Sequence, residues 1–140
     1  MTTRADRFTE LQKQDELYSD FLTNLNPHPT SGMLLRVVNE HAVTRSIRNL
    51  INTDRNERLF QPQIGSDIRK VLFEPMGSAT SEILSSLVQE TIDKYEPRAK
   101  VLKVEVIPNY EQNRYTVNVV YLLINKQDPI SVNITLQRVR

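Results

Sequence analysis

The stretch Tyr95-Glu96-Pro97-Arg98 decides the fold, because the hydrophobic period of the chain changes across it. Over residues 83–95, apolar side chains recur every three or four positions, which predicts an amphipathic helix. Pro97 cannot continue that helix, since it has no N–H and its ring clashes with the preceding turn. Over residues 102–106, apolar side chains alternate with charged ones, which predicts a strand. The chain therefore changes from helix to strand at a fixed corner.

The segments on either side of this corner predict an α+β fold. Downstream, three segments with the two-residue period of strands are joined by short connectors, which favours an antiparallel sheet. Upstream, Asn39 is the expected N-cap of one helix, and a short helix precedes Pro75. We expect a single small domain whose C-terminal sheet of three strands packs against about three helices. The strands are expected at 99–107, 114–124 and 130–138, and the apolar segment 33–38 is a possible fourth strand.

The beginning of the chain differs from the rest. Apolar residues between Phe8 and Leu25 fall at helix-like separations, but a polar run at 12–16 interrupts them and a proline-containing loop follows. We therefore divide the chain into an N-terminal arm, residues 1–31, and a domain, residues 32–140. The arm is either a solvated leader or a segment that becomes ordered against a neighbouring protein.

Composition excludes several classes of protein. The 140 residues suffice for one domain, and 18 basic against 17 acidic side chains give no overall charge for binding nucleic acid or a membrane surface. The chain has no cysteine, which excludes disulfides, thiol nucleophiles and cysteine-ligated metals and favours a cytosolic compartment. Neither a signal peptide nor an apolar run long enough to span a bilayer is visible.

The sequence offers no set of residues typical of a catalytic or metal site. His28 lies between two prolines and His41 at a helix start, and neither has a second ligand at metal-binding spacing. The three glycines are too far apart to form a phosphate-binding loop. We predict no catalytic residues, no metal and no cofactor.

The corner contains a charge pair whose acid lies at an unusual position in the helix. Glu96 lies in the last helical turn, where the negative end of the helix dipole disfavours a carboxylate, and Arg98 is the nearest cation. The two side chains either form an internal ion pair that shapes the corner or contact a partner. We expect an exposed pair that contributes about 0–1 kcal/mol to folding, so that substitutions there spare the fold. A basic group comprises Arg45, Arg48, Arg55 and Arg58. These arginines are either solvated or contact carboxylates of Glu96, Glu57 or a partner.

Three further stretches occur in a fixed order before the Glu-Pro-Arg triplet. They are Arg45-Ser46-Ile47-Arg48-Asn49-Leu50-Ile51-Asn52-Thr53, Glu57-Arg58-Leu59-Phe60-Gln61-Pro62-Gln63-Ile64-Gly65 and Leu72-Phe73-Glu74-Pro75. With the triplet, they resemble the small baseplate wedge family of contractile injection machines, which is found in contractile-tailed phages and type VI secretion baseplates. The resemblance covers about residues 17–140.

This resemblance implies a structural protein of the phage tail baseplate, assembled in the host cytoplasm. It implies that Glu96, Pro97 and Arg98 attach the chain to the helical core bundle of the wedge, with Arg45, Arg48 and Arg58 as further candidate contacts. The family's likeness to the strand-exchange module of sheath proteins implies a platform for sheath assembly. The implied partners are thus the other wedge proteins and the tail sheath subunit, with no nucleic acid and no membrane.

The last predicted strand suggests how a sheath subunit could dock. No element follows it, so its backbone is a candidate unpaired sheet edge that a partner strand could extend, with Thr135 and Gln137 as partner-facing positions. Alternatively, Arg138 and Arg140 blunt this edge.

The alternative function is a lysozyme-like peptidoglycan hydrolase associated with the baseplate. Such an enzyme requires two carboxylates in a cleft, one of them with a raised pKa. Among 17 acids some pair always lies at such a separation, and Glu105 shares a strand face with Lys103, which favours a solvated carboxylate. We therefore expect no enzymatic activity.

Overall fold

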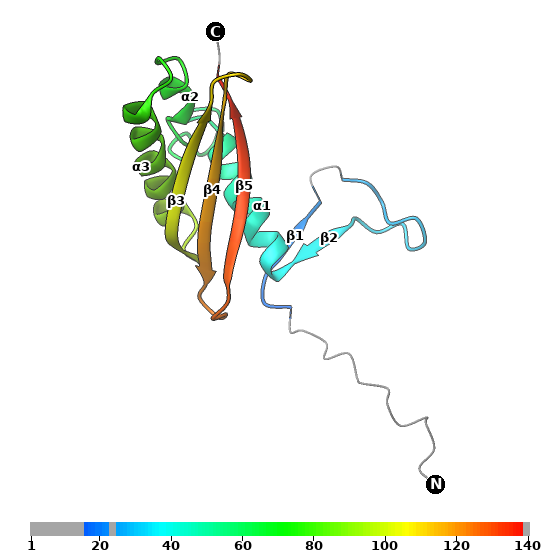
Figure 1. Cartoon of the computed structure of the whole chain (residues 1–140). Coiled ribbons are helices and arrows are strands. Elements are labelled where there is room, and N and C mark those ends of the chain that lie inside the picture. Colours follow the sequence, from blue (N-terminus) through cyan, green and yellow to red (C-terminus); the bar gives the residue numbers. More distant parts are fainter. Residues whose placement is uncertain (1–15, 23–24, 139–140) are drawn as a thin grey trace. The chain divides into compact units, whose positions relative to one another are not determined.

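The computed structural model describes residues 16–22 and 25–138 and confirms the α+β class (Figure 1). The chain forms two compact units, the first ending at Asn39 and the second beginning at Glu40. The elements are, in order, β1 (Ser19–Phe21), β2 (Arg36–Val38), α1 (Asn39–Asn52), α2 (Ile68–Val71), α3 (Ser78–Tyr95), β3 (Ala99–Asn109), β4 (Arg114–Leu123) and β5 (Pro129–Gln137). No helix within the described ranges has both the length and the apolar character needed to cross a membrane.

The first unit is built on a two-stranded sheet. β1 pairs antiparallel with β2, with Ser19 opposite Val38 and Phe21 opposite Arg36. The suggestion that segment 33–38 adds a fourth strand to the C-terminal sheet is therefore wrong, since its partner is a strand of the arm. The helix-like pattern of the arm is also wrong over Ser19–Phe21, where pairing with β2 imposes an extended backbone. The part of the arm before residue 16 lies outside the described residues.

Asn39, the predicted N-cap, begins α1. Its φ angle is +50°, a left-handed conformation that asparagine tolerates better than most residues. Its side-chain oxygen accepts hydrogen bonds from the backbone N–H groups of Leu17 (3.0 Å) and Tyr18 (3.4 Å). The side chain thus binds the backbone that precedes β1.

The second unit contains the predicted three-stranded sheet. β4 is the central strand, and it pairs antiparallel with β3 on one side and β5 on the other. The β4–β5 register is regular from Arg114 opposite Gln137 to Leu122 opposite Pro129, whereas a bulge interrupts β3 between Val101 and Lys103. The order β3-β4-β5 confirms the predicted meander.

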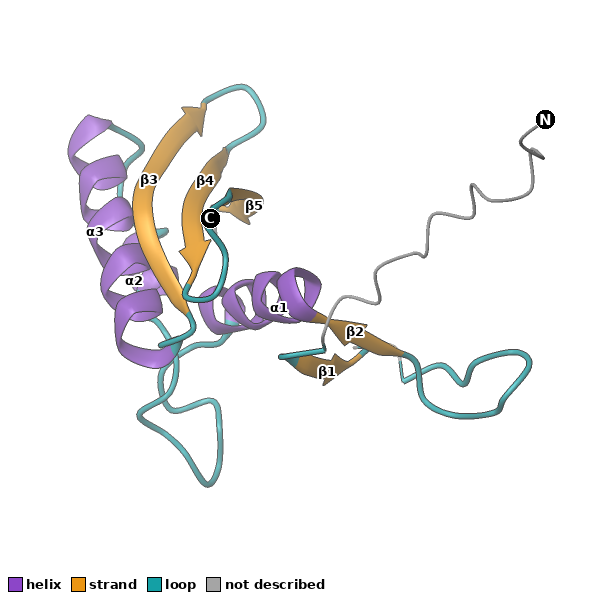
Figure 2. Cartoon of the chain, turned by 90° about the horizontal axis from the view of Figure 1, so that it is seen from below, coloured by secondary structure: helices purple, strands orange, loops and turns teal. Residues whose placement is uncertain are grey.

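One face of this sheet and the helices form the core. Side chains at alternate positions of β4 are buried, as the two-residue period predicts, and they meet buried residues of α1 and α3. Figure 2 shows α1 beneath β4 and β5 and α3 beside β3. The fully buried core residues include Val43, Ile47, Leu84, Val88, Ile92, Tyr115, Val117, Val119 and Tyr121.

Candidate assembly surfaces

The backbone of the Glu-Pro-Arg corner is fixed by three hydrogen bonds. The N–H of Glu96 donates to the carbonyl of Ile92 (2.8 Å), which completes the last turn of α3. The N–H of Ala99 donates to the carbonyl of Glu96 (3.1 Å), so Pro97 occupies the second position of a four-residue turn, which its ring geometry favours. The carbonyl of Arg98 accepts the N–H of Ile124 (3.2 Å) and begins the pairing of β3 with β4.

The charge pair at this corner is internal. Arg98 binds both carboxylate oxygens of Glu96, through Nε to Oε1 (2.5 Å) and through Nη2 to Oε2 (2.7 Å). The Glu96 side chain is 2% exposed and that of Arg98 is 35% exposed. The expectation of an exposed pair is therefore wrong for Glu96. The carboxylate also contacts the middle of α1, where Ser46 donates a hydrogen bond to it.

The surroundings of Glu96 keep it ionised. Burial acts to raise the pKa of Glu96, but hydrogen bonds from Arg98 and Ser46, together with the charge of Arg98, outweigh burial and hold the pKa below the ordinary value of 4.5. A charge-assisted, bidentate contact of this kind is stronger than a neutral hydrogen bond. The corner is thus a buried electrostatic joint between α1 and the α3–β3 turn.

A buried tyrosine extends the polar contacts of α1. The hydroxyls of Tyr121 and Thr44 form a hydrogen bond of 2.8 Å between β4 and α1. Burial raises the pKa of Tyr121 above its ordinary value of 10.0, and the negative charges of Glu40 and Glu96 raise it further, while the bond to Thr44 acts in the opposite direction. The sequence pattern marked Tyr121 only as part of an apolar strand and gave no signal for its polar contact.

The structure places the candidate arginines at different sites. Arg45 is half-buried on α1 beside Ser46, and Arg48 is exposed on the same helix. Arg58 is exposed in the loop between α1 and α2. Arg55 pairs with Asp67 (3.1 Å) rather than with Glu57. Within residues 16–22 and 25–138, neither Arg48 nor Arg58 forms an ion pair.

The outer edge of β5 has outward-facing backbone groups at the predicted positions. The N–H of Arg138 donates to the carbonyl of Asn113 (3.1 Å), in the same register as the β4–β5 pairs. Because hydrogen-bonded and non-hydrogen-bonded pairs alternate in an antiparallel ladder, Leu136 bonds to β4, while Thr135 and Gln137 point their N–H and C=O groups away from it. Both side chains are exposed.

The opposite edge of the same sheet is partly closed. By the same alternation, Val104 and Pro108 of β3 direct their backbone groups away from β4. The hydroxyl of Ser85, on α3, donates to the carbonyl of Val104 (3.2 Å). Pro108 has no N–H to offer an incoming strand. These features make β5 the edge better suited to strand addition.

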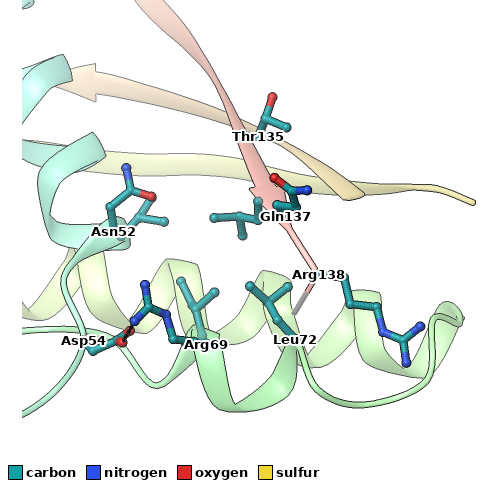
Figure 3. Close-up of a pocket in the computed structure, with 10 residues that line it drawn as sticks. Asn52, Asp54, Arg69, Leu72, Thr135, Gln137 and Arg138 are labelled. Carbon is teal, nitrogen blue, oxygen red and sulfur yellow. Dashed lines mark ion pairs between the residues drawn. The ribbon is translucent and has the colours of Figure 1, made fainter. Parts of the chain in front are cut away.

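A groove of about 520 Å³ lies beside the C-terminal half of β5 (Figure 3). Its apolar lining comes from three separate parts of the chain, namely the end of α1, α2 with the residue after it, and β5. These side chains are Ile51, Ile68, Leu72 and Leu136. The ion pair of Arg69 with Asp54 (2.8 Å) lies among its polar lining, to which Arg138 also contributes. A strand added to β5 could place alternate side chains into this groove.

The described residues contain no group of three or more His, Asp and Glu side chains arranged to hold a metal ion. Asp54 is the only carboxylate among the residues that line the groove, and its partner is a cation. The groove therefore combines apolar side chains with a polar lining of two cations, one anion and three neutral groups.

Comparison with known proteins agrees with this geometry. Residues 37–128, more than half of the chain, match the family model described as Baseplate wedge protein gp25. The chain belongs to the baseplate wedge protein gp25 family. Baseplate wedge protein gp25 of Enterobacteria phage T4 is 30% identical over 89 residues, which are 64% of this chain and 67% of the phage protein. The predicted family is thus confirmed.

Two solved structures share the fold. A chain of the anti-feeding prophage baseplate has a TM-score of 0.69 at 22% identity, covering 79% of this chain and 89% of that one. A protein from Geobacter sulfurreducens, named as a candidate tail lysozyme, has a TM-score of 0.69 at 22% identity, covering 74% of this chain and 96% of that one. At this identity the likeness supports the fold and not an activity.

Proposed function

We propose that this chain is a structural component of a contractile-tail baseplate wedge, which attaches to the wedge core bundle and provides a platform for the tail sheath. Family membership supports the baseplate role. The observation that carries the platform role is the open β5 edge beside an apolar groove, because edge N–H and C=O groups without partners are a template for an incoming strand. A sheath subunit is the proposed donor of that strand.

The corner would attach to the core bundle through its outer surface. Pro97 is exposed, and about a third of the Arg98 side chain faces solvent while Glu96 fixes the direction of its guanidinium. Arg48 adds an exposed cation on α1. A preoriented guanidinium loses little conformational freedom when it binds a carboxylate of a partner helix. Glu96 therefore acts as a positioning residue, and Arg98 and Pro97 as the contacting ones.

Charge reversal at Arg48 tests this attachment separately from folding. We expect Arg48→Glu to melt like the wild type, because Arg48 is exposed and unpaired within the described part of the chain, yet to bind wedge core proteins at least tenfold more weakly. Lys100→Glu, an exposed cation on β3, is the matched control and should bind normally. Equal binding by both variants would remove α1 from the proposed attachment surface.

The name of the Geobacter protein raises the alternative of a peptidoglycan hydrolase. The groove argues against it, since Asp54 is the only carboxylate that lines it and is paired with Arg69, and Glu105 pairs with Lys103 on an open strand. We propose that the chain has no hydrolase activity. Zymography of the purified protein should show no clearing, and clearing that Asp54→Asn or Glu105→Gln abolishes would establish an enzyme instead.

A further inference from the structure

The loop between α1 and α2 carries two apolar side chains that have almost no contact with the rest of the chain. Leu59 is 92% exposed and Phe60 is 97% exposed, more than any other large apolar side chain that the structure describes. The loop projects beyond the helices (Figure 2). Single exposed apolar residues are common, but two adjacent ones at a loop tip favour burial against another surface.

Backbone contacts hold the two ends of this loop together. The N–H of Asn56 donates to the carbonyl of Pro62 (2.9 Å), and the N–H of Ser66 donates to the carbonyl of Thr53 (2.9 Å). Gly65 has a φ angle of +145°, and a Cβ atom there would lie 2.6 Å from the carbonyl oxygen of Asp54. Only glycine permits this close approach.

A side chain from the helix before the corner also holds the loop. The Tyr95 hydroxyl donates a hydrogen bond to the carbonyl of Gln63. Since Tyr95 directly precedes Glu96, the return arm of the loop is joined to the proposed attachment corner. The loop is therefore ordered before any partner binds, which lowers the entropy lost on binding.

The charges at the loop tip indicate what kind of surface it fits. The carboxylate of Glu57 accepts the N–H of Asp54 (2.8 Å), and Arg55 pairs with Asp67. Arg58, next to Leu59, has no ion pair within the described ranges. The tip thus presents one cation beside two apolar groups. A complementary site has an apolar pocket and a carboxylate at its rim.

We propose that residues 58–60 form an insertion element that enters an apolar, acid-rimmed pocket of a neighbouring baseplate protein. This rests on the proposed function, because it requires an adjoining component of the wedge. A second copy of this chain fits poorly, since the only acid that lines the groove beside β5, Asp54, is already paired with Arg69, and the remaining charge there is that of Arg138, which would repel Arg58. Phe60 is the expected centre of the contact, in keeping with the role of aromatic side chains at interface hot spots.

Binding to wedge subassemblies prepared without this chain tests the proposal. The double variant Leu59→Ser with Phe60→Ser should raise the Kd at least tenfold and leave thermal melting of the free protein unchanged. Arg58→Glu should also raise the Kd at least tenfold, because it opposes the acidic rim. Tyr110→Ser, which removes an aromatic ring that is 65% exposed at the β3–β4 turn, should leave the Kd within twofold.

The outcomes separate this proposal from the proposed function. If the wild type does not bind the subassembly, both fail. If the wild type binds and the double variant binds equally well, only the insertion element is overturned, and equal binding by Arg58→Glu overturns the acidic rim.

A photoreactive phenylalanine analogue in place of Phe60 identifies the protein that contains the pocket. In assembled baseplates it should cross-link to another baseplate protein, at apolar residues next to Asp or Glu. Cross-links to a second copy of this chain, or Phe60-dependent binding of the free protein to anionic phospholipid vesicles, would overturn the assigned partner.

Discussion

The Glu96–Arg98 corner and the β5 edge are both candidate contact surfaces, but they differ in where their polar groups find partners. At the corner, the carboxylate is 2% exposed and is bound by Arg98 and Ser46 within the chain. At the edge, the outward N–H and C=O groups of Thr135 and Gln137 have no partner within the described residues. The polar groups of the corner thus find their partners within the chain, whereas those of the β5 edge are available to another protein.

Because of this difference, substitutions at the corner affect folding and substitutions at the edge affect assembly. Removing one member of a buried ion pair leaves an uncompensated charge, so substitutions at the corner act first on stability. A change to an outward N–H of an edge strand removes no internal hydrogen bond, so it acts on association. A loss of assembly therefore has a different physical cause at each surface.

The largest expected effect on folding is that of Arg98→Ala. It should lower the free energy of unfolding by about 3 kcal/mol at neutral pH, at the low end of the range for a broken buried pair because Arg98 is partly exposed. Urea denaturation measures this loss. Arg48→Ala is the control and should change stability by less than about 0.5 kcal/mol. A loss below about 1 kcal/mol for Arg98→Ala would show that the corner contributes little to folding.

The pH dependence of stability separates the contribution of the Glu96 charge from the contribution of the backbone shape of the corner. The folded-state pKa of Glu96 lies below its unfolded value, so the unfolded chain binds more protons, and the stabilisation present above pH 4.5 is lost as the pH falls through the folded pKa. Glu96→Gln should remove this component. In Arg98→Ala, burial should raise the pKa of Glu96, and stability should instead fall as the pH rises.

Denaturation curves between pH 3 and pH 7 show whether the stability of each variant rises or falls with pH. Asp67 also has a lowered pKa, through its hydrogen bond to Lys70, while burial opposes this and the charges of Arg55 and Lys70 assist it. Asp67→Asn therefore provides the comparison. Identical pH profiles for wild type and Glu96→Gln would contradict the assigned role of Glu96.

A smaller effect is expected from Tyr121→Phe. This variant removes the hydroxyl that bonds to Thr44 and should lower stability by about 1 kcal/mol, the usual value for one hydrogen bond. Tyr110→Phe, at an exposed site, is the matched control. No difference between the two variants would show that the Thr44–Tyr121 bond adds nothing to the joint of α1 with the sheet.

The sequence predicted those parts of the fold that depend on local periodicity. α3 and the three C-terminal strands follow from the change of hydrophobic period at Pro97, and their order follows from short connectors. Segment 33–38 has the composition of a strand, but composition does not identify the pairing partner, which lies in β1. The contact of the Asn39 side chain with the backbone of Leu17 and Tyr18 was not predictable either, because these residues lie far from Asn39 in the sequence.

The candidate surfaces were predictable to different degrees. The spacing of Glu96 and Arg98 indicated a pair, but its burial depends on Ser46, which lies 50 residues earlier in the chain. The outward direction of Thr135 and Gln137 depends on the β4–β5 register. The groove could not be predicted, because its lining comes from three separate segments that meet only in the folded chain.

Sheath growth on baseplates that carry Thr135→Pro tests most directly whether the open edge is the docking surface. Proline removes the outward N–H and should leave every β4–β5 hydrogen bond in place. Thr135→Val keeps the N–H and the branched shape, and is the matched control. We predict that baseplates with Thr135→Pro assemble but nucleate no sheath, whereas those with Thr135→Val grow sheaths of normal length. Normal sheaths on particles confirmed to contain Thr135→Pro would contradict docking at the β5 edge.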